Sequence, residues 1–284
     1  MTPVYRASFS PFTFNQLLQE IAALFRRLIL QSYRRSSFLI AGLIQPLLWL
    51  VLFGALFQKS TLPIFYDRTI YYDEFLASGI IVFTAFTSSL NAGLPIMFDR
   101  EFGFFNRLLV VPITSRLSIV VASFYYIVCV TFIQMLTICI IAIIKNKIQA
   151  FISPSAVFCG VLILLLLICL VTILSIILSF ILSGHIELLA LILLINLPIL
   201  FSSTALAPLN FMPSWLQFVA TVNPLTYAIE ALRYILMFNK FVFDEKIILT
   251  IFGPLSTIRI ILYFSVLNII SFSVANYFFH KKLE

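Results

Sequence analysis

Residues 117–144 read LSIVVASFYYIVCVTFIQMLTICIIAII, a run of 28 residues without Asp, Glu, His, Lys or Arg. An α-helix rises about 1.5 Å per residue, so about 20 apolar residues cross the roughly 30 Å hydrocarbon core of a membrane. Similar apolar runs lie at 38–57, 75–98, 155–182, 188–206 and 258–279. The sequence therefore predicts an all-α polytopic membrane protein with six transmembrane helices in a single domain over residues 1–284.

The composition agrees with this class and excludes several others. Of the 284 residues, 62% are hydrophobic and 10% are charged, whereas a soluble domain is about half apolar and a quarter charged. A soluble enzyme and a disordered chain are both excluded, because the first needs a polar surface and the second needs low hydrophobicity. The net charge of +7 suits an anionic membrane surface. The basic residues are not clustered as in a nucleic-acid site, so we expect membrane lipid as a partner and no nucleic acid.

Cysteine and histidine supply no chemistry that we can identify. The four cysteines lie inside the apolar runs, and none is spaced as a metal ligand would be. His185 and Glu187 are too few to form a metal site, so we interpret them as part of a solvated turn. We therefore predict no metal site and no catalytic residue.

The N-terminal residues 1–37 are the most polar long stretch. They contain five arginines against one acidic residue, and apolar residues recur at helical spacing from Phe14 to Ile29. An amphipathic helix with arginine on its polar face favours the membrane interface. The alternative is a soluble helix that packs on a partner protein.

The distribution of basic residues predicts the orientation. Five arginines precede the first apolar run. The loop between the first and second runs contains only two basic residues, Lys59 and Arg68. Positive residues favour the cytoplasmic side of a membrane. With six spans, we expect both termini on the cytoplasmic side or, in a plastid, on the stromal side.

The apolar runs are poor in groups that move ions. Arg259, at the end of a run, is the one Asp, Glu, His, Lys or Arg within them. Ion-coupled carriers need such groups inside the membrane, so this class is disfavoured. Gln45, Asn91, Gln134 and Asn196 are polar but uncharged, and we expect them to hydrogen-bond between helices rather than contact a substrate.

Two loops carry the remaining information. The second loop opens with Asp99-Arg100-Glu101 and continues with an apolar stretch to Pro112, a pattern that predicts either a knob for a soluble partner or a simple solvated loop. The fifth loop, 207–257, stays apolar, and within it Asn223-Pro224 is typical of an N-cap followed by proline at the first helical position. We expect this loop to form a re-entrant helical hairpin on the outer side, because backbone at membrane depth must be helical or shielded.

The second loop and the last third of the chain each carry a series of short motifs. They are Asp99-Arg100-Glu101, Gly103, Leu108-Leu109 and Pro112, then Asn196-Leu197-Pro198, Ala207-Pro208, Met212-Pro213-Ser214-Trp215-Leu216, Asn223-Pro224-Leu225-Thr226-Tyr227, Glu230 and Arg233. In this order and spacing the chain resembles, over nearly its whole length, the ABC-2 type permeases, which are membrane subunits of ATP-binding cassette exporters. The resemblance also suggests a cyanobacterial or plastid-encoded member.

The resemblance implies a mechanism. Such permeases pair as two copies, here a homodimer, and dock separate ABC ATPase subunits, with the substrate passing between the protomers. By resemblance, Asp99, Arg100, Glu101 and Gly103 couple the chain to the ATPase. The residues that close the outer gate would be Trp215, Asn223, Pro224, Tyr227, Glu230 and Arg233. The membrane would be a plastid membrane or a bacterial inner membrane.

The sequence itself indicates that ATP binds elsewhere. A phosphate-binding loop needs a Gly-Lys pair, and no glycine in this sequence is followed by lysine. We therefore expect no cofactor on this chain, no enzymatic activity of its own, and ATP on the partner subunit. The alternative function is a membrane scaffold or assembly factor that transports nothing.

Overall fold

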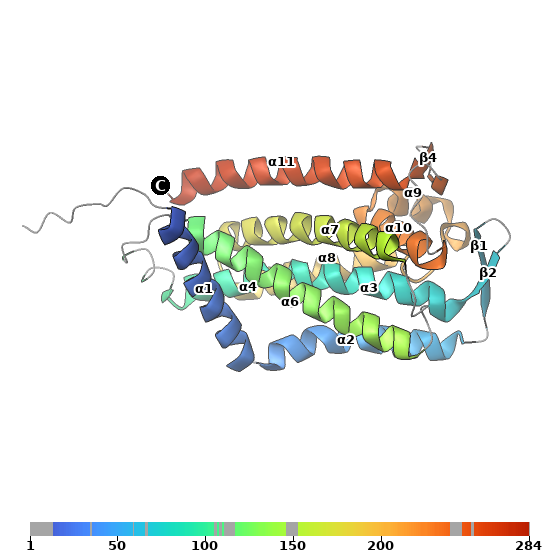
Figure 1. Cartoon of the computed structure of the whole chain (residues 1–284), viewed down its shortest axis with the longest axis horizontal. Coiled ribbons are helices and arrows are strands. Elements are labelled where there is room, and N and C mark those ends of the chain that lie inside the picture. Colours follow the sequence, from blue (N-terminus) through green and yellow to red (C-terminus); the bar gives the residue numbers. More distant parts are fainter. Residues whose placement is uncertain are drawn as a thin grey trace, which may run out of the picture.

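The computed structural model is an elongated helical bundle with two short β-hairpins (Figure 1). The described residues are 14–34, 36–58, 60–65, 68–104, 107, 110, 117–145, 153–238, 246–250 and 253–283. The elements are α1 (Phe14–Arg34), α2 (Ser36–Leu56), β1 (Thr61–Phe65), β2 (Arg68–Tyr71), α3 (Tyr72–Leu90), α4 (Gly93–Glu101), α6 (Leu117–Ile144), α7 (Pro154–Ile181), α8 (His185–Phe201), η1 (Leu209–Phe211), α9 (Ser214–Val222), α10 (Pro224–Phe238), β3 (Lys246–Thr250), β4 (Gly253–Ser256) and α11 (Thr257–Leu283). The predicted all-α class is confirmed.

Four described segments are long and apolar enough to cross a membrane. They are Tyr72–Glu101, Ser118–Ile144, Pro154–Ile181 and Thr257–Phe279. Two shorter apolar helices, Gly42–Leu56 within α2 and the whole of α8, cover the first and fifth predicted runs. The structure therefore places a helix at each of the six runs, and four of them reach spanning length.

The second and fifth predicted runs differ in detail from the structure. The run 75–98 is divided, because α3 ends at Leu90 and α4 begins at Gly93. Ser175 of α7 stabilises this break, since its Oγ donates to the Leu90 carbonyl at 2.5 Å and accepts from the Gly93 N–H at 2.9 Å. These bonds satisfy backbone groups that an interrupted helix would leave exposed to an apolar environment.

The fifth predicted run, 188–206, ends earlier than expected. The helix α8 stops at Phe201. In a continuing helix the Ile199 carbonyl would accept from Ser203, but it accepts from the Asn223 side chain at 2.9 Å, and the Ser203 N–H bonds to Leu200 instead. The outer segment of the chain therefore terminates α8.

Uncharged polar residues join the helices in the middle of the bundle. Thr87 Oγ1 donates to Asn196 Oδ1 at 3.1 Å, and Ser88 donates to Gln134. These bonds tie α3 to α8 and to α6, so the predicted role is confirmed for Asn196 and Gln134. Asn91 instead bonds the Thr87 carbonyl of its own segment.

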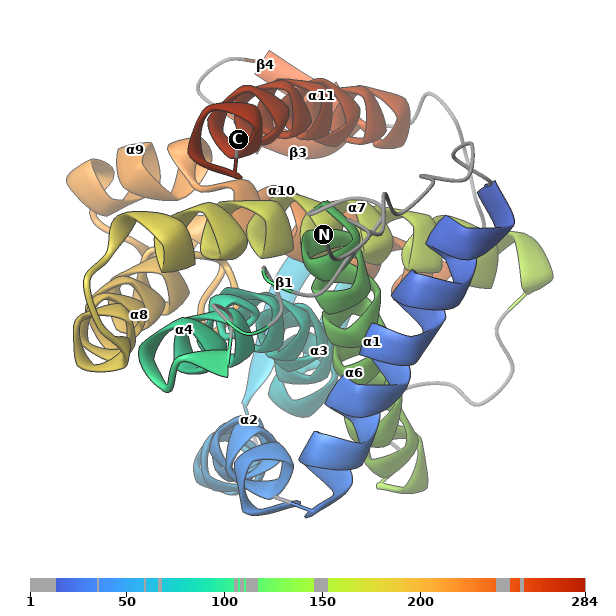
Figure 2. The ribbon, with the colours of Figure 1, turned by 90° about the vertical axis from the view of Figure 1, so that its left-hand side faces the viewer.

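The helix α3 forms the centre of the bundle, with α2, α6, α7 and α10 packed around it. Figure 2 shows this arrangement along the bundle axis. From Phe75 to Thr87 every side chain of α3 is buried. The outer helices are different, because α11 exposes Ile269, Phe272 and Tyr277 to the surroundings.

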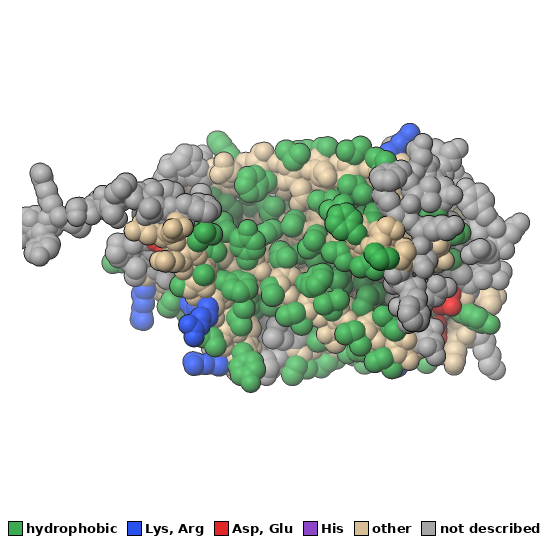
Figure 3. Space-filling model, viewed as in Figure 1, with side chains coloured by type: hydrophobic (Ala, Val, Ile, Leu, Met, Phe, Trp, Pro, Cys, Tyr) green, Lys and Arg blue, Asp and Glu red, His purple; other side chains and the backbone are tan. Residues whose placement is uncertain are grey.

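The surface divides into an apolar middle and charged ends. In Figure 3 hydrophobic side chains cover the middle of the visible face, and Lys, Arg, Asp and Glu lie towards the two ends. Exposed apolar area of this extent is unusual for a soluble monomer and suits contact with lipid.

The helix α1 lies across one end of the bundle rather than along it (Figure 1). One face packs on α6, where Leu28 is buried, and the other carries the exposed Arg26 and Arg34. The predicted amphipathic helix is therefore present, and it contacts the chain's own bundle. The end of α11 lies at this same end, which we call the inner end, and the β-hairpins lie at the opposite, outer end. Residues 1–13 and most of 105–116, including Leu108, Leu109 and Pro112, lie outside the described residues.

Candidate functional site

The last turn of α4 carries three consecutive charged residues, Asp99, Arg100 and Glu101. Successive residues on an α-helix point about 100° apart, so three in a row point towards three different neighbours. Each of these side chains contacts a different helix or its end. We call these residues, together with Arg27 and His185, the inner cluster.

Asp99 connects α4 to α1. The Arg27 Nη2 atom lies 2.5 and 2.6 Å from the two carboxylate oxygens of Asp99. The Asp99 side chain is only 12% exposed. The Arg27 guanidinium also lies 3.9 Å from the ring centre of Phe104, which follows α4. The helix α1 is therefore attached to the tip of α4 by an ion pair and a cation–π contact.

Arg100 connects α4 to the end of α7. Its Nη1 atom donates to the Ser179 carbonyl and, at 3.5 Å, to the Leu182 carbonyl. The last carbonyls of a helix have no partner within the helix, and a cation there also interacts favourably with the helix dipole. The ring of Phe180 lies 5.5 Å from the guanidinium.

Glu101 connects α4 to the start of α8. Its Oε2 atom accepts from the His185 backbone N–H at 3.1 Å and lies 2.5 Å from His185 Nδ1. His185 is the first residue of α8, so the carboxylate binds one of the free amides at a helix N-terminus. His185, which we interpreted as part of a solvated turn, is the first residue of α8, and its 29% exposed side chain is paired with Glu101 at the surface.

Gly103 ends α4 with a backbone conformation that favours glycine. Its φ is +73°, and its N–H bonds to the Arg100 carbonyl at 3.3 Å. An added Cβ would meet nothing within 4 Å, so the requirement comes from the backbone alone. The preceding Phe102 is 69% exposed and stacks on Phe98. The tip of α4 is therefore a defined turn with an apolar side chain exposed at the inner end.

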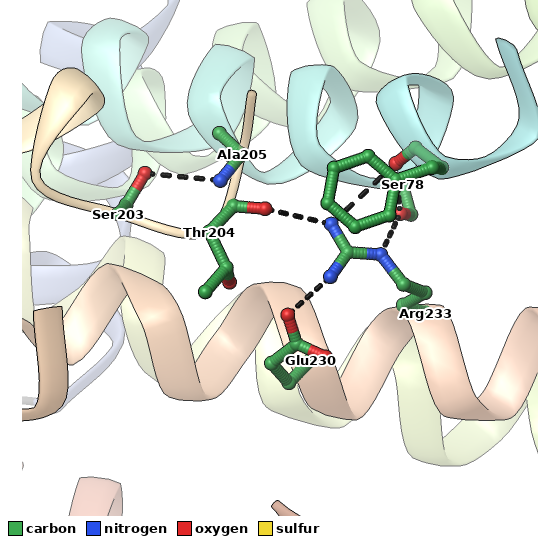
Figure 4. Close-up of polar contacts among 7 residues, drawn as sticks. Ser78, Ser203, Thr204, Ala205, Glu230 and Arg233 are labelled. Carbon is green, nitrogen blue, oxygen red and sulfur yellow. Dashed lines mark hydrogen bonds and ion pairs between the residues drawn. The ribbon is translucent and has the colours of Figure 1, made fainter. Parts of the chain in front are cut away.

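A second cluster lies at the outer half of the bundle, around Arg233 of α10 (Figure 4). The Arg233 side chain is 1% exposed and forms an ion pair with Glu230, three residues earlier in the same helix. It also donates to the Thr204 carbonyl at 2.8 Å and to Ser78 Oγ at 3.2 Å. The guanidinium lies 3.6 Å from the ring centre of Phe75. We call Phe75, Ser78, Thr204, Glu230 and Arg233 the outer cluster.

The outer cluster joins three separate parts of the chain: α3, the segment after α8, and α10. The backbones approach closely here, because a Cβ on Gly79 would lie 2.6 Å from the Ala205 carbonyl oxygen. A buried charge must be paired and hydrogen-bonded to be tolerated, and Arg233 meets this requirement. The predicted Glu230–Arg233 pair is therefore present, with partners that its spacing alone does not reveal.

Asn223 and Tyr227 hold the start of α10. The Asn223 Oδ1 atom accepts from the Leu225 N–H at 3.0 Å, and Pro224 is the first residue of the helix, so the predicted N-cap is confirmed. The Asn223 amide also donates to Ile199 and, at 3.1 Å, to Ser202. Tyr227 donates to the Thr221 carbonyl at the end of α9. The start of α10 is therefore bonded both to α8 and to α9.

Trp215 is the one predicted outer residue that the structure places apart from these contacts. It lies on α9, and its side chain is 69% exposed. In the part of the chain that the structure describes, no group of three His, Cys, Asp or Glu side chains is arranged to hold a metal ion.

The sequence is similar to a family model and to three curated proteins. The family model described as "ABC-2 type transporter" matches residues 19–237. A protein of Porphyra purpurea, named "Putative transport permease ycf38", is 52% identical over 87% of this chain and 84% of its own. Proteins with the same name from Pyropia yezoensis and Cyanophora paradoxa are 46% and 44% identical, over 100% and 94% of this chain and 97% and 89% of their own.

Proposed function

The chain belongs to the ABC-2 type transporter family, and on this premise we propose that it is the permease subunit of an ATP-driven exporter. In this proposal a separate ABC ATPase binds the inner end and supplies the energy, while the permease forms the path for the cargo. The sequence has no Gly-Lys pair for a phosphate-binding loop, which supports a separate source of ATP binding.

The observation that carries the proposal is the construction of the inner cluster. Three charges on one helical turn attach the tip of α4 to α1, α7 and α8. A force on this tip therefore acts on three helices at once. The exposed Phe102 and the turn at Gly103 give a partner an apolar contact next to this junction. We propose that the ATPase binds here, and that Asp99, Arg100 and Glu101 transmit its movement rather than bind it directly.

We further propose that α2, α3–α4, α6, α7, α8 and α11 form six membrane crossings. These elements run along one common axis, and α1 crosses that axis at the inner end, as an interfacial helix would (Figure 1). In the same topology α9 and α10 form the re-entrant outer hairpin, and both termini face the cytoplasm or stroma.

The outer cluster supports a gate in the proposed exporter. Arg233 holds the segment after α8 against α3 and α10 through bonds to Thr204 and Ser78. Opening an outer exit would require these elements to separate. A ligand can only favour the open state by contacting the two states differently, so the ATPase would have to bias the bundle from the inner end.

The complete transporter in this proposal contains two copies of the chain and two ATPase subunits in a plastid membrane. The plastid assignment is supported by the high phenylalanine content, 31 residues, and by the low glycine content, 8 residues. It is also supported by the relatives from Porphyra purpurea, Pyropia yezoensis and Cyanophora paradoxa.

The proposal is tested by purifying the tagged chain in mild detergent from membranes that contain it. We expect an ATPase with a phosphate-binding loop to co-purify, and we expect its membrane association to disappear when the chain is deleted. The variant Phe102→Ala should lower the yield of the ATPase, whereas Trp215→Ala, at an equally exposed position on the outer end, should not. An ATPase that stays on the membrane without the chain would contradict the proposal. The alternative, a membrane scaffold or assembly factor, would then be favoured.

A further inference from the structure

We propose that His185 is a positioning residue through which α4 moves α8, so that α8 carries the inner movement to the outer hairpin. This inference rests on the proposed function and adds a route from the inner end to the outer end. The relevant contacts lie at both ends of α8, and each involves backbone groups that the helix itself leaves free.

At the inner end, α4 offers complementary charges to two helix termini. The end of α7 presents free carbonyls to Arg100, and the start of α8 presents a free amide to Glu101. A cation at a helix C-terminus and an anion at a helix N-terminus are each favourable with respect to the helix dipoles. If Arg100 and Glu101 exchanged places, each charge would face a helix terminus of the same sign, which is unfavourable. Adjacent Arg100 and Glu101 therefore hold α4 in one register against the α7–α8 turn.

His185 makes the contact to α8 two-fold, because both its backbone amide and its ring bind the same carboxylate oxygen. The ring also lies 5.2 Å from the ring of Phe98, one turn earlier on α4. The start of α8 thus contacts α4 at two successive turns. Movement of α4 without α8 would break all three contacts.

At the outer end, α8 is bonded to the hairpin. Asn223 donates to the Ile199 carbonyl and to Ser202, and Ile199 lies in the last turn of α8. The helix α8 runs from His185 to Phe201 with Pro198 in its last turn, where one backbone hydrogen bond is missing, and Asn196 holds it to α3 just before that point. We therefore expect a movement of His185, the first residue of α8, to displace Asn223, which caps α10.

One substitution removes the contact to Glu101 and keeps the helix. In His185→Pro both the ring and the backbone N–H are lost. Proline is favoured at the first position of a helix, where the N–H has no partner within the helix. The residue before it, Gly184, has φ −149° and ψ 166°, which is the extended conformation that a following proline favours. The variant His185→Ala keeps the backbone N–H and removes only the two contacts of the ring, with Glu101 and with Phe98.

A matched control lies on the next residue. Ile186 is 72% exposed on the same turn of α8. The variant Ile186→Ala changes a side chain at the same end of the helix and leaves the Glu101 contact in place.

The experiment reports movement at the outer hairpin in response to ATP at the inner end. The chain carries Trp215→Cys on α9, labelled with an environment-sensitive fluorophore by a water-soluble maleimide. It is reconstituted in lipid vesicles with the ATPase that co-purifies with it. The four native cysteines lie in α6 and α7, and a sample that retains Trp215 measures their background labelling. The emission change on adding ATP is recorded, along with the amount of bound ATPase and the thermal stability.

We expect His185→Pro to lower the emission change by up to about fivefold, the upper limit for loss of one exposed ion pair. His185→Ala should fall between this variant and the parent, and Ile186→Ala should match the parent. Bound ATPase and thermal stability should be unchanged in all of them. Parent-like emission changes in His185→Pro would overturn the inference, and so would a parallel loss of bound ATPase, which would assign His185 to docking. Absence of ATPase from the parent complex would refute the proposed function instead.

Discussion

The outer cluster gives a quantitative prediction, because Arg233 is almost fully buried and has identified partners. The perturbation is Arg233→Ala. It removes the ion pair with Glu230, the donors to Thr204 and Ser78, and the contact with the ring of Phe75. The Glu230 carboxylate, which is only 9% exposed, then has no cation as a partner.

The size of the effect follows from the burial. Removing one member of a buried ion pair costs about 3–5 kcal/mol, since the remaining charge stays buried and unpaired. Arg233→Lys keeps the charge but has no planar fork to reach several acceptors, so we expect a loss of about 1–3 kcal/mol. The double variant Glu230→Ala with Arg233→Ala should lose about 2 kcal/mol less than the sum of the single variants, because it leaves no unpaired charge.

The assay is equilibrium unfolding in mixed micelles by increasing SDS, followed by tryptophan fluorescence. The chain has two tryptophans, Trp49 and Trp215, so the signal comes from few sites. Arg26→Ala is the matched control, because Arg26 is an exposed arginine on α1. Its free energy of unfolding should stay within about 0.5 kcal/mol of the parent.

The reasoning would be refuted if Arg233→Ala unfolded within about 0.5 kcal/mol of the parent. It would also be refuted if the two single variants and the double variant were strictly additive. Either result would mean that the hairpin, α3 and the segment after α8 are not held together by this guanidinium.

Substitutions at three further positions test other parts of the structure. Gly103→Ala should lower the free energy of unfolding by about 1 kcal/mol, because φ is +73° at this residue, and Gly103→Asn should lower it less. Equal unfolding midpoints for the two variants would contradict this. Asn223→Ala loses both the cap on Leu225 and the donors to Ile199 and Ser202, so its free energy of unfolding in SDS should fall by about 1–2 kcal/mol, and Asn223→Ser, which keeps a capping oxygen, should lose less. Gly79→Ala should lower the thermal unfolding midpoint, because its Cβ would lie 2.6 Å from the Ala205 carbonyl, and an unchanged midpoint would show that the backbones separate easily.

The apolar runs could be predicted because their signal is local. The limits of α6 and α7 follow from composition alone, and the start of α10 follows from the Asn223-Pro224 pair. The break between Leu90 and Gly93 was missed because the run 75–98 is apolar throughout. Asn91, Gly93 and Pro95 within five residues were the available signal, since each weakens a continuous helix.

The contacts of the two clusters could not be predicted because they join residues far apart in the chain. The sequence identified Asp99, Arg100 and Glu101 as a charged corner, but the partner of Glu101, His185, is 84 positions away. Likewise Arg233 was paired correctly with Glu230, while its bond to Ser78 spans 155 positions. A single sequence shows which residues are chemically unusual, and the packing of the bundle decides which of them meet.

The central claim, that a separate ATPase drives this permease from its inner end, is tested most directly by site-specific photocrosslinking in native membranes. A photoreactive phenylalanine replaces Phe102 at the tip of α4 or, in the control, Trp215 on α9, two side chains that are each 69% exposed at opposite ends of the bundle. We predict an adduct between position 102 and an ATPase that contains a phosphate-binding loop, and no such adduct from position 215. An ATPase adduct from position 215 alone, or none from either position while the chain still exports cargo in the presence of ATP, would contradict the account.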